Sequence, residues 1–119
     1  MPIDIAYSVG NAVTITNTET SLAVNGGSTT LQTITDTGSF MIKLDAVGVL
    51  AKGDDYLFRF YEKATSSSSK VIAIQFHIMH AMSEMIIVPA IIYGAGWDAT
   101  LQRISATSRA WNWSINRVS

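Results

Sequence analysis

Apolar and polar residues alternate along most of the chain with a period of two, which is the period of β-strands that bury one face. The alternation is clearest in residues 40–45 and 53–63. We expect the apolar face of each segment to lie in the core, with these members: Phe40, Ile42, Leu44, Tyr56, Phe58 and Phe60.

Short segments rich in Gly, Asn, Asp and Ser separate the alternating segments, and they predict turns because Gly and Asn tolerate positive φ. Two of these turns are expected at residues 9–11 and 25–28. Helical periodicity is almost absent. Only residues 45–52 predict a helical turn, with Asp45 as its cap and Gly53 at its end. Strands are predicted at 3–5, 13–23, 29–35, 40–45, 53–63, 70–80, 85–93, 97–102 and 111–115.

Pro89 lies inside the predicted strand 85–93. Because proline cannot donate to a sheet ladder, we place this strand at a sheet edge or a bulge. Eight or nine short strands with few two-residue hairpins favour two sheets joined by crossing connections. We therefore expect an all-β, antiparallel β-sandwich of about eight strands, jelly-roll-like, in one domain over residues 1–119. Residues 1–10 form either its first strand or an N-terminal arm.

Composition narrows the class of partner. Apolar residues make up 48% of the 119 residues, which is enough for one compact core. Charged residues make up only 14%, against about 25% in a typical protein, and low charge suits assembly as well as a monomeric domain. The net charge of −1 provides no basic excess for binding nucleic acid. Because the chain has no cysteine, disulfides, thiolate zinc sites and cysteine nucleophiles are excluded.

The chain begins without the basic and apolar pattern of a signal peptide. Its longest apolar run, residues 85–96, contains a proline and is too short to span a bilayer. We therefore expect no membrane partner and folding in the cytoplasm.

Two groups of polar residues are candidates for chemistry. His77 and His80, with Glu84 nearby, have the residue types of a metal site, but residues three apart in a strand face opposite sides. Asp54 and Asp55 form an acidic pair that suits catalysis or calcium. Since they lie at a turn, we expect them to accept hydrogen bonds from the backbone instead.

Other signatures of catalysis are missing from the sequence. No serine stands in a Gly-x-Ser-x-Gly setting, and no glycine loop has the strand–loop–helix context of a phosphate cradle. We therefore expect no enzymatic activity, no cofactor and no metal.

Three tryptophans allow two interpretations. Trp97, Trp111 and Trp113 are either core residues or a platform that stacks against a sugar ring. Three arginines surround the last two rings in sequence and suit a cation–π cluster: Arg103, Arg109 and Arg117.

The strands after residue 70 carry more apolar residues than one sheet face can bury. A second apolar face must be covered by a loop or by a neighbouring subunit, and we favour a subunit. On the mixed face of segment 53–63, an arginine and a tyrosine are available to pair within the chain or across a subunit contact. The candidate interface residues are Arg59, Tyr61, Met79, Met82, Met85, Ile87, Ile91 and Tyr93.

The C-terminal two-thirds of the chain carries a series of short motifs. They are Thr37-Gly38-Ser39-Phe40, Leu50, Gly53-Asp54, Leu57 to Lys63, Trp97, Thr100-Leu101-Gln102 and Trp111 to Arg117. In these motifs, residues 37–117 resemble small tailed-bacteriophage virion proteins of the capsid decoration or cement type. The sequence departs from that group at residues 106–108, where Ala-Thr-Ser replaces a turn like Gly-Thr-Gly.

The resemblance implies a jelly-roll-like β-sandwich, assembled as a trimer, that binds the outer capsid shell and stabilises the head. The implied partners are the major capsid protein and other copies of the chain, and the implied place is the capsid surface of the virion after synthesis in the host cytoplasm. The resemblance brings no catalytic residues. Two other functions stay open: a carbohydrate-binding module of a head or tail fibre, and a structural component of the neck or tail.

Overall fold

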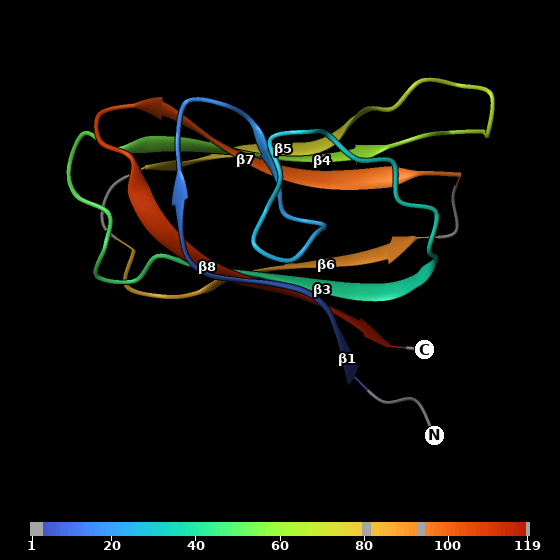
Figure 1. Cartoon of the computed structure of the whole chain (residues 1–119), viewed down its shortest axis with the longest axis horizontal. Helices are drawn as coiled ribbons and strands as arrows, with labels where there is room; N and C mark the ends of the chain where they lie inside the picture. Colours follow the sequence, from blue (N-terminus) through green and yellow to red (C-terminus); the bar gives the residue numbers. More distant parts are fainter. Residues whose placement is uncertain (1–3, 80–81, 93–94, 119) are drawn as a thin grey trace.

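A computed structural model describes residues 4–79, 82–92 and 95–118. They form two four-stranded antiparallel sheets packed face to face (Figure 1), which confirms the predicted all-β sandwich. The described part of the chain contains no helix, and therefore none that is long and apolar enough to cross a membrane. The strands are β1 (Asp4–Ile15), β2 (Thr20–Ser21), β3 (Gly38–Asp45), β4 (Asp55–Glu62), β5 (Val71–Met79), β6 (Ile86–Ile92), β7 (Trp97–Ser105) and β8 (Arg109–Val118).

The strand order is β1-β8-β3-β6 in the first sheet and β2-β7-β4-β5 in the second. Of the consecutive strands, only β4 and β5 are neighbours in one sheet, so the other connections cross between the sheets, as expected. Two hydrogen bonds hold β1 beside the segment that follows β2: Ser8 Oγ donates to the Leu22 carbonyl at 2.7 Å, and the Val9 N–H donates to Asn25 Oδ1 at 2.9 Å. The two remaining edge strands, β5 and β6, therefore lie at the opposite side of the sandwich.

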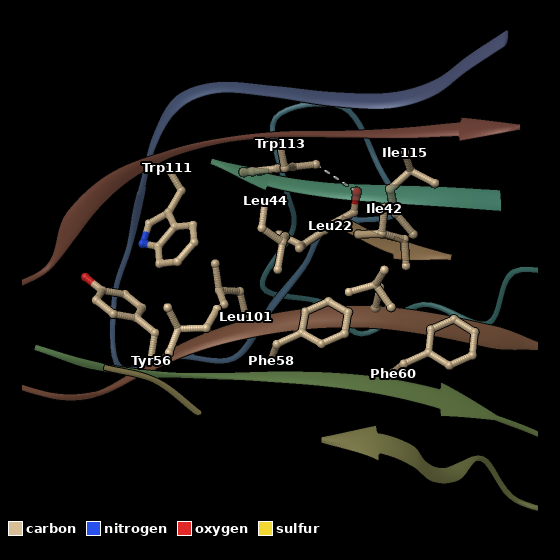
Figure 2. Close-up of a cluster of buried hydrophobic side chains, with 14 of the residues drawn as sticks. Leu22, Ile42, Leu44, Tyr56, Phe58, Phe60, Leu101, Trp111, Trp113 and Ile115 are labelled. Atoms are coloured by element: carbon tan, nitrogen blue, oxygen red, sulfur yellow. Dashed lines mark hydrogen bonds between the residues drawn. The ribbon is translucent and has the colours of Figure 1, made fainter. Parts of the chain in front are cut away.

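The core lies between the two sheets (Figure 2). The predicted inward faces of β3 and β4 are confirmed, because all six of their expected core residues are buried. From β8, the Trp113 indole N–H donates to the Leu22 carbonyl at 3.0 Å, the bond drawn as a dashed line in Figure 2. The labelled core residues are Leu22, Ile42, Leu44, Tyr56, Phe58, Phe60, Leu101, Trp111, Trp113 and Ile115.

The turn predicted at residues 9–11 is wrong, because β1 runs through it. The strand instead carries two irregularities in its pairing with β8, one between Ala6 and Ser8 and one between Gly10 and Val13. Ala12 has a positive φ of 52° at the second irregularity. A bulge accommodates extra residues within a strand, so the chain continues through residues 9–11 without turning. Residues 4–10, for which an arm was one expectation, pair with β8 of the same chain.

The strand predicted at 29–35 is also wrong, and that predicted at 13–23 is split between β1 and the two-residue β2. Residues 29–35 contribute only an isolated bridge between Ile34 and Trp97. The segment crosses from one sheet to the other, and the Gln32 N–H donates to the Asp98 carboxylate at 2.8 Å. Its threonines lie at the surface without the continuous partner that a strand requires.

After Asp45, the last residue of β3, residues 46–52 form turns where a helical turn was expected. Asp45 does accept a hydrogen bond from the Val47 N–H at 3.0 Å, in the manner of a cap. Gly48, however, has a φ of +76°, which ends any helical geometry at once. Leu50 is buried, whereas Val47 is exposed. Gly53, with a φ of +95°, leads the chain into β4.

Candidate interaction surfaces

Exposed apolar side chains collect on two edge strands, β5 of the second sheet and β6 of the first. In β5, seven of nine residues are exposed and only Ile78 is buried. Strands of a sandwich usually bury alternate residues, so this degree of exposure is unusual. Ile74 is 40% exposed even though it stands opposite the buried Phe60 of β4. The inward face of β5 is therefore incompletely covered by the chain itself.

The outward face of β6, in the first sheet, is also apolar. Ile91, for example, is 65% exposed. Pro89 lies in the middle of the strand, which confirms its predicted place at a sheet edge. We call the exposed large apolar residues of β5, β6 and the position before β6 the apolar side: Val71, Ile72, Ile74, Met79, Met85, Ile87 and Ile91.

The structure distributes the eight predicted interface residues unevenly. Four of them belong to the apolar side: Met79, Met85, Ile87 and Ile91. Met82 is half-buried and packs against the core. Tyr93 lies outside the described residues. The other two, Arg59 and Tyr61, lie on β4 and do not belong to the apolar side.

Arg59 and Tyr61 lie on the outward face of the second sheet and both contact Glu19, from the connection between β1 and β2. The Arg59 guanidinium is 3.3 Å from the Glu19 carboxylate, and the Tyr61 hydroxyl donates to the same oxygen at 2.6 Å. Thr100 adds a third contact at 2.5 Å. Burial, followed by the neighbouring carboxylate, raises the pKa of Tyr61 to about 12. Arg59 therefore makes its ion pair within the chain.

Asp54 and Asp55, the acidic pair at the start of β4, have different hydrogen-bond partners. Asp54 is 2% exposed and accepts hydrogen bonds from the N–H groups of Ala51 at 2.8 Å and Thr107 at 3.3 Å. It also accepts one from Arg109 Nε at 2.9 Å. The bond from Ala51, with those from Thr107 and Arg109, outweighs burial and lowers the pKa of Asp54. The predicted turn role is confirmed for Asp54.

Asp55 points elsewhere and lies 2.8 Å from Nδ1 of His77, on the neighbouring strand β5. The two carboxylates therefore do not converge on one ligand. His77 and His80 were the candidate metal pair, and His80 lies outside the described part of the chain. Within the described part, no group of three potential ligands is placed to hold a metal ion.

The tryptophan platform is wrong, because all three rings are core residues. Trp97 and Trp111 are 0% exposed and Trp113 is 3% exposed. Trp97 packs against Phe40 with a centroid separation of 4.9 Å. The rings lie on the inward faces of β7 and β8, where the opposite sheet covers them, so no sugar can stack on them.

A buried carboxylate in β7 was missed by the sequence analysis. Asp98 is 0% exposed and accepts hydrogen bonds from Ser21 Oγ at 2.6 Å, the Gln32 N–H at 2.8 Å and the Ala99 N–H at 2.9 Å. Burial raises the pKa of Asp98 in spite of these bonds. The available signal was a lone acid within the apolar run of Trp97, Ala99 and Leu101. Its role is to anchor the crossing segment to the sheet.

An open cavity of about 310 Å³ lies on the outward face of the first sheet. Lys43 and Asp45 bring opposite charges to its wall, beside Met85, Asn112 and Ser114. The wall offers hydrogen bonds but no arrangement of nucleophile and base.

Comparison of the chain with protein-family models, curated proteins and solved structures finds no match. Function must therefore be argued from the chain's own surfaces. Asp54, Asp98 and Glu19 are all committed to hydrogen bonds that hold loops to strands. The apolar side is the described surface best suited to binding another protein.

Proposed function

We propose that this chain is a structural protein of a phage virion, which binds the outer capsid shell and stabilises the head. The observation that carries the proposal is the apolar side, with seven exposed large apolar residues on β5, on β6 and at the position before β6. Removing apolar surface from water contributes about 25 cal/mol per Å². A surface of this kind favours association with other protein subunits.

The capsid is proposed as the partner because of the resemblance over residues 37–117. Several residues that carry it have structural tasks: Trp97 and Trp111 are core residues, and Asp54 shapes a turn. A shared pattern of this type supports a shared fold more than a shared active site. The strand orders and the crossing connections are compatible with a jelly roll, an architecture common in viral capsid domains, and we assign the chain to it on that basis.

Stabilisation in this proposal comes from many copies acting together. Each copy buries a modest area against the major capsid protein, of the order of 1,600 Å² for an ordinary interface. Contacts that span neighbouring capsid subunits then add, because release of the shell requires several of them to break. The mechanism requires no cofactor, no catalysis and no contact with the genome. The proposed place is the capsid surface, after synthesis in the host cytoplasm.

The outward face of β6 is the surface that we assign to the capsid. It exposes Ile87 and Ile91, and Met41 extends it onto β3, since Met41 stands opposite Pro89 in the sheet. These side chains point away from the sandwich core. They can therefore be buried against a partner without any change in the fold.

The experiment is reconstitution of particles that lack the protein. Purified chain is added, the particles are heated, and the temperature at which the genome is released is recorded. We expect the wild-type chain to raise that temperature and the double variant Ile87→Lys/Ile91→Lys to bind poorly and lose the effect. Val47→Lys is the matched control, because Val47 is equally apolar and exposed but lies in the turn after β3.

Circular dichroism of each variant establishes that it is folded. Unchanged particle stability with the wild-type chain bound would contradict the cement role. A low-resolution map of the particle, showing copies on the shell or only at the neck and tail, tests the location separately.

A further inference from the structure

The four sheet edges of the molecule are protected to different extents. Native proteins protect exposed edges with short strands, bulges, proline or charged residues. β2 has only two residues, β1 carries two bulges, and β6 has Pro89 at its centre. β5 has nine residues, Val71–Met79, with no proline and no Lys, Arg, Asp or Glu, and its one irregularity is at Ala73 in the pairing with β4.

The outer edge of β5 has an unused row of backbone groups. β5 is the last strand of its sheet, so its alternate N–H and C=O groups point away from β4. None of the hydrogen bonds among the described residues reaches these groups. Nine residues correspond to a row about 30 Å long, which is a template for another strand.

We propose that β5 pairs with β5 of a second copy of this chain, antiparallel, about a two-fold axis at Gln75. The two second sheets then join into one continuous eight-stranded sheet. This inference does not depend on the capsid role, because it concerns contact between copies alone.

The sequence of β5 is self-complementary in this register. Gln75 is the central residue of the strand and lies in its regular stretch, residues 74–79, so an axis there pairs Ile74 with Phe76 on both sides. On the inward face, Ile74 of each copy meets Phe76 of the other. These two apolar pairs cover Ile74, which the chain itself leaves exposed. Apolar cross-strand pairs of this kind stabilise paired strands.

The outward face contains no repulsive pair in the same register. His77 stands opposite Ala73 of the second copy, so the two histidines do not face each other. The two Gln75 amides meet at the axis, where each is already oriented by Arg59 Nε at 3.2 Å from its carbonyl oxygen. An interface that uses the same surface on both copies is the usual way in which homodimers form. This explains why a second copy fits β5 better than an unrelated strand.

The test uses the absence of cysteine from the chain, which allows single cysteines to be introduced into a clean background. Gln75→Cys places the two sulfurs opposite each other, where Cα atoms about 4.5–5.5 Å apart suit a disulfide. Val71→Cys is the control, because Val71 lies on the same strand and is 62% exposed. In the proposed register, the two copies of residue 71 are about 27 Å apart.

We expect the purified wild-type chain to have twice its monomer mass by light scattering. Under mild oxidation, we expect Gln75→Cys to become a covalent dimer and Val71→Cys to stay single on a non-reducing gel. Equal cross-linking of the two single variants, or a native mass of one or three copies at the highest concentration, would overturn the two-fold pairing. Such a result would contradict only the pairing of copies. The proposed function would still stand if the chain binds the capsid.

Discussion

The ring of Trp113 fills the space that a side chain at position 10 would need. A Cβ on Gly10 would lie 2.3 Å from Cη2 and Cζ3 of that ring. Trp113 stands directly opposite Gly10 in the pairing of β1 with β8, and its indole N–H is held by the Leu22 carbonyl. A glycine that the sequence suggests to be part of a turn is therefore a point of close packing within a strand.

Replacement of Gly10 by alanine should destabilise the fold by about 1–3 kcal/mol, as overpacking of a core usually does. Urea unfolding followed by circular dichroism measures the loss. The double variant Gly10→Ala/Trp113→Phe provides the control, because the smaller ring vacates part of the space. We expect the double variant to lose less stability than the two single variants lose together, with a difference of more than about 0.5 kcal/mol. Additive costs would show that the contact is not the cause.

Phe58 lies at the centre of the sandwich and is 0% exposed. Its ring stacks on that of Phe76 with centroids 5.1 Å apart. Phe58→Ala removes this packing and leaves a cavity, so it should lower the free energy of unfolding by about 3–5 kcal/mol. Val47→Ala, at an exposed position, should change it by less than about 0.5 kcal/mol. A loss below about 1 kcal/mol for Phe58→Ala would place the ring outside the core.

Asp54 should make stability depend on pH in the acid range. The amide in Asp54→Asn keeps one acceptor oxygen but loses the charge that attracts Arg109. We expect Asp54→Asn to cost about 1.5–3 kcal/mol at neutral pH, the usual value of hydrogen bonds to a charged group. Urea unfolding at neutral pH measures this cost.

The direction of the pH effect follows from the lowered pKa of Asp54 in the folded chain. The folded state holds this proton less tightly than the unfolded chain, whose value is near 3.8. The stability advantage of the wild type over Asp54→Asn should therefore be complete above about pH 3.8. It should shrink as the pH falls through the lower pKa that Asp54 has in the folded state. A difference that stays constant down to the acid transition would contradict a charged Asp54.

Features that depend on local periodicity, such as the buried face of a strand, could be predicted from the sequence. Features that depend on contacts between distant residues could not. The faces of β3 and β4 were predicted because their alternation reflects one buried side. The bulge near Gly10 depends on Asn112, whose side chain accepts a hydrogen bond from the Ala12 N–H at 2.6 Å across 100 positions. No local pattern contains that partner.

The surfaces show the same division. The excess of apolar residues after position 70 indicated the apolar side, since it is a matter of composition along two strands. The choice between a tryptophan core and a tryptophan platform could not be made, because it depends on whether the opposite sheet covers Trp97 and Trp111. Arg59 was ambiguous for a similar reason, since Glu19 comes from a connection 40 positions away.

Asp98 offers a test of how the crossing segment 29–35 is held. Its carboxylate accepts hydrogen bonds from Ser21, Gln32 and Ala99, so Asp98→Ala should leave two buried donors and one half-buried donor without this acceptor. Each buried unsatisfied group costs about 1–3 kcal/mol, and we expect a total loss of at least about 2 kcal/mol. Asp45→Ala is the matched control, because Asp45 accepts one bond in an exposed turn, and it should cost less than about 1 kcal/mol.

Hydrogen exchange separates a local effect of Asp98 from a global one. The Gln32 amide should lose its protection in Asp98→Ala by more than the core amides of β4 do, because its acceptor is gone while the sheet remains paired. Equal loss of protection at both places would mean that Asp98 supports the whole sandwich and not the crossing segment in particular.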